Sequence, residues 1–63
     1  MVKFGRIWKI ETAEDYRTAI ETLKDNEWYA MMGEGVDNFR REMAEIERQR
    51  ADVTAQARAR GII

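Results

Sequence analysis

Glu42 and Glu45 are the carboxylates whose spacing could support chemistry, because residues three apart share one face of a helix. Such a pair can bind a metal or act as general acid and base, but a carboxylate metal site in a helical bundle normally adds a Glu-x-x-His motif. The chain has no histidine and no cysteine, so it lacks the commonest general base, the commonest metal ligand and any thiolate nucleophile. We therefore expect a solvated helix face here, with no metal, no cofactor and no enzymatic activity.

Gly33-Glu34-Gly35 is the second motif to consider, because glycine-rich loops can hold phosphate groups. The Lys-Ser/Thr pair that follows a phosphate-binding loop is missing, and no dinucleotide-binding pattern surrounds the glycines. Two glycines within three residues can supply the positive φ angles that a helix end and a tight turn require. The motif therefore predicts a turn over residues 33–36 and no phosphate site.

Basic residues interleaved with aromatic ones are typical of segments that bind nucleic acids. In this chain they are Lys3, Arg6 and Lys9 with Phe4 and Trp8, followed further along by Arg40, Arg41, Arg48, Arg58 and Arg60. The net charge is only −1, and acids at helical spacing, such as Glu45 before Arg48, offer the arginines partners within the helix. A small nucleic-acid-associated regulator is therefore the alternative function, and nucleic acid the less favoured partner.

Large aromatic and methionine side chains outside the core stripe indicate a contact with another protein. Trp28, Tyr29 and Met32 point away from the stripe if the first helix continues unbroken, and Trp8 completes this set. These residues either form a surface for a partner protein, or they close a dimer core and pack under the N-terminal segment with Trp8. Both readings predict a protein–protein contact.

The elements that would position these residues begin with a strand-like segment, residues 1–11. Val2, Phe4, Trp8 and Ile10 fall on one face of an alternating pattern. The segment is the only one of its kind in the chain, and a lone strand has no neighbour for its main-chain hydrogen bonds. It therefore pairs with the same strand of a second copy, pairs with the sheet edge of another protein, or lies as an extended arm on a helix.

Residues 12–32 are predicted to form the first helix. Thr12 and Asp15 have the spacing of a capping box, in which each side chain accepts a hydrogen bond from the other residue's main chain. Apolar residues then recur at alternating spacings of three and four as far as Ala30, with Glu27 as a polar interruption. This pattern predicts one buried stripe along the helix.

Residues 37–61 are predicted to form the second helix, with Asp37 as a cap at its start. A heptad pattern runs from Val36 to Ala57 without a slip, which is typical of a coiled coil. Arg50 is the polar member of this seam, and it either extends its charge into solvent or fixes the register of the helices. Gly61 can close the helix in a left-handed conformation.

A short turn makes the two helices antiparallel neighbours. The predicted fold is therefore mostly α, an antiparallel two-helix hairpin with a short N-terminal extended arm or strand. The predicted register brings Glu27 near Arg40 or Arg41, and Arg50 near Glu21.

The chain has 63 residues and is a single small domain. Twenty-eight residues are apolar and eight of these are alanine, and a core of this size rarely supplies more than roughly 3–5 kcal/mol. Without a disulfide or a metal, we expect a homodimer that forms a four-helix bundle. The residues expected at the self-association seam are Tyr16, Ile20, Leu23, Phe39, Met43, Ile46 and Val53.

No apolar run approaches the ~20 residues of a membrane span, and no apolar segment follows the first basic residues as it does in a secretory signal. We therefore expect a cytoplasmic protein that has no membrane partner. The function predicted from these patterns is a non-catalytic protein–protein interaction module. It would be a self-associating helical hairpin that acts as a small assembly subunit, an adaptor or an inhibitor of another protein.

Overall fold

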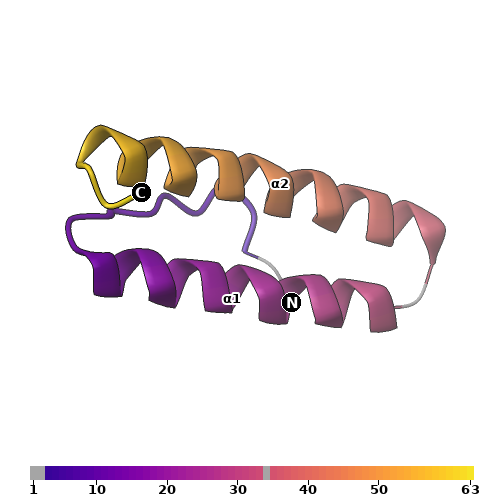
Figure 1. Cartoon of the computed structure of the whole chain (residues 1–63). Coiled ribbons are helices and arrows are strands. Elements are labelled where there is room, and N and C mark those ends of the chain that lie inside the picture. The colour runs from indigo at the N-terminus through magenta and orange to yellow at the C-terminus, as the bar shows by residue number, and fades with distance from the viewer. Residues whose placement is uncertain (1–2, 34) are drawn as a thin grey trace.

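Two antiparallel helices and an extended N-terminal segment make up the structure, a computed structural model that describes residues 3–33 and 35–63 (Figure 1). Helix α1 spans Ala13–Met32 and helix α2 spans Val36–Ala59. The predicted mostly α hairpin is therefore confirmed. Residues 3–11, which we call the arm, run back along the helices, and no strand forms in the described ranges. Val2 and Glu34, which belong to the predicted strand and turn, lie outside these ranges.

The start of α1 has the predicted capping box. The Asp15 N–H donates to Thr12 Oγ1 over 3.1 Å, and the Thr12 N–H donates to Asp15 Oδ2 over 3.1 Å. The Glu11 N–H donates to the same carboxylate oxygen. These bonds satisfy main-chain donors that have no partner inside the helix, and Glu14 and Asp15 complement the positive helix end.

The connection between the helices differs in two ways from the prediction. Gly35 has a φ of +91° and directly precedes α2, whereas Gly33 has a φ of −69° and lies in extended backbone. Only Gly35 of this pair therefore needs the conformational freedom of glycine. The prediction that Asp37 caps α2 is wrong, because the helix already begins at Val36 and Gly35 is its N-cap residue. Asp37 lies in the first turn, where its charge still favours the positive helix end.

The end of α2 closes as predicted. Gly61 has a φ of +76°, and the Ile62 N–H donates to the Ala57 carbonyl over 2.8 Å while the Gly61 N–H donates to the Arg58 carbonyl. This is a Schellman motif, which satisfies carbonyls of the last turn. It also turns Ile62 back against the core.

The core is built from three elements, because the arm adds a third layer to the two helices. Its buried apolar residues are Trp8 and Ile10 of the arm, Ala19, Leu23 and Ala30 of α1, and Ile46, Val53 and Ala57 of α2. The molecule measures 39 × 15 × 15 Å. In the described part of the chain, no helix is long and apolar enough to cross a membrane.

The predicted partners of the two polar seam residues are wrong. Arg50 pairs with Glu27, with 3.0 Å between Nη2 and Oε2, and not with Glu21. The polar interruptions of the two apolar stripes face each other across the hairpin, and both side chains stay partly exposed. Arg50 thus keeps its charge at the solvent edge while its carbon chain lies along the seam.

Candidate functional site

Exposed apolar side chains gather at the end of the hairpin that carries the turn. Six of the nine large hydrophobic side chains that are exposed in the described ranges lie between residues 28 and 39. They are Trp28, Tyr29, Met31, Met32, Val36 and Phe39, and we call them the tip patch. Single exposed apolar residues are ordinary on a protein surface, whereas a concentration of them at one place indicates a contact surface.

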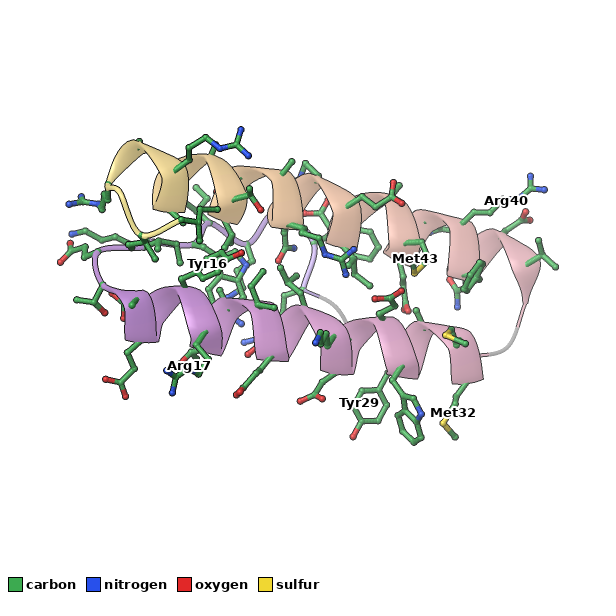
Figure 2. All side chains as sticks on the ribbon, viewed as in Figure 1. Tyr16, Arg17, Tyr29, Met32, Arg40 and Met43 are labelled. Carbon is green, nitrogen blue, oxygen red and sulfur yellow. The ribbon has the colours of Figure 1, made fainter. Side chains whose placement is uncertain are left out.

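Trp28, Tyr29 and Met32 form the outer part of the tip patch. Ala30 is buried against the core, so the phase of α1 turns its neighbours outward, and Figure 2 shows Tyr29 and Met32 directed away from α2. The three residues are 56%, 55% and 64% exposed. The rings of Trp28 and Tyr29 meet edge to face with their centroids 5.3 Å apart. An aromatic pair beside a flexible methionine has the composition of an interaction hot spot.

A shallow hollow forms the inner part of the tip patch between the ends of α1 and α2. It is lined by Ala30, Met31, Gly33, Gly35, Val36 and Phe39. Three of these residues have small side chains or none, so they leave the floor open, while the other three supply apolar walls. The hollow can therefore accept an apolar side chain of a partner.

The residues predicted for self-association divide into two groups. Leu23, Ile46 and Val53 are fully buried inside one chain, so they hold the hairpin together and offer no surface to a second copy. The other members are Tyr16, Ile20 and Met43, which are partly buried against the core, and Phe39, which is exposed. Figure 2 shows Tyr16 and Met43 between the helices.

Trp8, predicted as a partner contact, lies in the core of its own chain. It is 9% exposed, and its Nε1–H donates to Gln49 Oε1 over 2.9 Å. The guanidinium carbon of Arg6 lies 3.7 Å from the centroid of the indole ring, a cation–π contact that covers the ring from outside. Trp8 can reach a partner only if the arm leaves the helices.

Gln49 and Gln56, which were not among the predicted site residues, hold the arm in place. The Gln49 amide donates to the Lys3 carbonyl over 2.8 Å. The Gln56 amide donates to the Trp8 carbonyl over 2.7 Å and accepts from the Ile10 N–H over 2.9 Å. The spacing of seven residues, which puts both glutamines on one flank of the heptad seam, was the available signal.

Glu45 and Arg48 continue this contact with the arm. Glu45 accepts the Gly5 N–H over 3.1 Å, Arg48 donates to the Arg6 carbonyl, and the two side chains form an ion pair with each other. Hydrogen bonds from Arg48 and Gln49, supported by the Gly5 N–H, lower the pKa of Glu45 from 4.5 to about 2 although burial opposes this shift. The arm is thus held by charged as well as neutral groups.

Glu42 and Glu45 do not act as a matched pair in this structure, because Glu45 is engaged with the arm and with Arg48. Over the described ranges, no group of three or more acidic side chains is placed to hold a metal ion.

Several of the cations predicted for nucleic-acid binding contact groups within the chain. Lys9 forms an ion pair with Glu11 and Arg48 forms one with Glu45, and Arg6 covers Trp8. These contacts reduce the basic character of the arm and of the middle of α2. Arg40 extends outward from α2 (Figure 2).

Comparison with known proteins finds no match to any family model, curated protein or solved structure.

Proposed function

We propose that this chain is a non-catalytic interaction module, a self-associating helical hairpin that contacts another protein through its tip patch. The observation that carries the proposal is the position of the patch. The arm contacts the part of α2 from Glu45 to Gln56, and the tip patch lies beyond the part that the arm covers. Trp28 and Tyr29 supply a large apolar area with few rotatable bonds, which lowers the entropic cost of binding.

Self-association is supported by the surface that a single chain exposes. The accessible surface is 4700 Å², whereas a compact globular chain of this size exposes about 4200 Å². The elongated hairpin therefore carries excess surface, and the partly exposed seam residues Tyr16, Ile20, Phe39 and Met43 lie on it. A second copy packed on these residues would give a four-helix bundle.

Light scattering over a concentration series tests self-association. We expect a dimer that Met43→Glu dissociates while the helical signal in circular dichroism is retained, because Met43 is only partly buried. Ile46→Asp is the matched core substitution and should unfold the chain, because Ile46 is fully buried. A folded monomer at all concentrations would contradict self-association.

Affinity capture with the native chain and with a Trp28→Ala/Met32→Ala variant tests the tip patch. We expect a specific protein that is retained by the native chain, lost by the variant and retained by Arg17→Ala. Arg17 is the control because it points outward from α1 far from the turn (Figure 2). If the patch variant retains the same proteins as the native chain, the patch is not the contact surface.

The alternative proposal is a small nucleic-acid-associated regulator. It predicts duplex binding that weakens steeply between low and moderate salt, because each contacted phosphate releases counterions. Binding with such a slope would favour the regulator over the interaction module, and an absence of binding at low salt would remove it.

A further inference from the structure

We propose that the surface covered by the arm, on α2 and against the core, is a binding site for an extended polypeptide segment. We call this surface the groove, and we propose that it takes the arm of a second copy of this chain in exchange for its own. This site is separate from the tip patch. Its occupant is visible in the structure, because the arm lies in the groove and shows which groups the groove recognises.

The groove recognises the main chain of its occupant. Side chains of α2 bind five main-chain groups of the arm, which are the carbonyls of Lys3, Arg6 and Trp8 and the N–H groups of Gly5 and Ile10. Gln56 uses both ends of its amide, one for the Trp8 carbonyl and one for the Ile10 N–H. An extended strand offers its neighbour the same pair of groups on either side of one residue. The side chains of α2 thus replace the missing partner strand.

Two side chains of the arm anchor it. Ile10 is fully buried and Trp8 nearly so, and the indole N–H is bound by Gln49. Ile7 precedes Trp8 in the sequence and is 86% exposed, so its side chain does not anchor the arm. The required occupant is therefore an extended segment with an aromatic residue, an aliphatic residue two positions later and a tight bend near Gly5, where φ is +75°.

The hydrogen bonds at the link between the arm and α1 do not depend on which copy binds the arm. The N–H groups of Glu11 and Thr12 both bind Asp15, inside the first turn of α1. Neither bond involves α2, so neither has to break for the arm to leave its own α2. The contacts that hold the arm are made forty or more residues away in sequence.

Exchange is favoured over simple release of the arm. Release would expose Trp8 and Ile10 and would leave the amides of Gln49 and Gln56 without their partners. A second copy restores each of these contacts with the same residue types, which is why exchange of an identical element is a low-cost route to a dimer. A segment of another protein would have to reproduce the anchors and the bend together.

Complementation between two full-length variants tests the proposal. Trp8→Ala keeps an intact groove but loses the anchor of its arm. Gln49→Ala/Gln56→Ala keeps an intact arm but damages the groove. An added Trp28→Phe in both chains leaves Trp8 of the second chain as the only tryptophan in the mixture. We expect that mixing the two chains shifts the Trp8 fluorescence to the blue and slows deuterium exchange at the Ile10 amide of the second chain by at least tenfold.

The control is a mixture in which both chains carry Gln49→Ala/Gln56→Ala, where no intact groove exists and no shift is expected. If Trp8→Ala unfolds the chain on its own, a gain of helical circular dichroism on mixing reports the same event. A dye-labelled peptide of residues 1–11 should likewise bind the Trp8→Ala chain and not the groove variant. Signals that equal the sum of the separate chains, together with no peptide binding, would overturn exchange and leave the tip-patch proposal untouched.

Discussion

Trp8 and Trp28 show how the surroundings of a residue decide its role. Trp8 is buried, bound through its indole N–H and covered by Arg6. Trp28 is exposed, and among the aromatic rings described it contacts only that of Tyr29. Both are large aromatic residues in apolar stretches of sequence, so their composition alone could not assign one to the core and the other to a contact surface.

Trp8→Ala should lower the free energy of unfolding by about 3–5 kcal/mol, because it removes a buried aromatic side chain and leaves a cavity. This loss is comparable to the whole stability expected of so small a core. Trp28→Ala should change the free energy of unfolding by less than about 0.5 kcal/mol, as is usual at an exposed position. Urea denaturation followed by circular dichroism measures both, and equal effects of the two substitutions would contradict the assignment.

The Glu45 carboxylate should make stability depend on acid. Its pKa is about 2 in the folded chain and near 4.5 when its partners are absent, so the unfolded state takes up a proton first as the pH falls. The stabilisation is complete above pH 4.5 and is lost progressively between about pH 4.5 and 2. Denaturation of the native chain and of Glu45→Gln across this range should show a shallower pH dependence in the variant, and identical slopes would contradict this role.

At the scale of the elements, the helices and the arm differ in how far local sequence determines them. The helices follow from stripes, from the capping box at Thr12 and from the glycine at position 61, all of which act within a few residues. The position of the arm depends on Gln49 and Gln56, and polar residues beside a heptad seam look like any solvated flank. The sequence alone therefore could not decide between the three arrangements predicted for residues 1–11.

The outer residues of the tip patch could be predicted for the same local reason, because helical phase alone turns Trp28, Tyr29 and Met32 away from the stripe. The inner hollow could not, because Phe39 and Val36 continue the apolar seam of α2 and are expected to be covered. They stay exposed, and they line the hollow together with Gly33 and Gly35, which have no side chains.

Gly35→Ala should lower the free energy of unfolding by about 1–3 kcal/mol, because a φ of +91° is strained for any residue with a Cβ atom. The strain is conformational, since no atom lies within 4 Å of the position that a Cβ would occupy. Gly33→Ala is the matched control. Gly33 has a φ of −69°, so the free energy of unfolding of this variant should stay within about 1 kcal/mol of that of the native chain. Thermal and urea unfolding compare the two, and a larger loss at Gly33 would contradict the described turn.

At the scale of the whole molecule, the hairpin separates two kinds of surface along its 39 Å length. At one end, where α1 begins and α2 finishes, the arm and the Schellman motif close the hairpin, and the C-terminus lies there (Figure 1). The opposite end carries the tip patch. A partner at the tip therefore has access that no described part of the arm obstructs.

Self-association should make thermal stability depend on protein concentration, because a second copy that binds only the folded chain stabilises it by mass action. We expect the melting temperature to rise steadily over a hundredfold increase in concentration for the native chain. Met43→Glu should remove this dependence without abolishing the transition. A melting temperature that is constant for the native chain would contradict a dimer that contributes to stability.

The distance in sequence between the arm and its binding residues has a consequence for how the protein is made. Ile10 leaves the ribosome 46 residues before Gln56, its hydrogen-bond partner. At translation rates of about 5–20 residues per second, that interval lasts roughly 2–9 s. Throughout this time each nascent chain displays Trp8 and Ile10 without the groove that buries them. A completed chain nearby already has this groove, so it could capture the first residues of a nascent chain before that chain has a groove of its own.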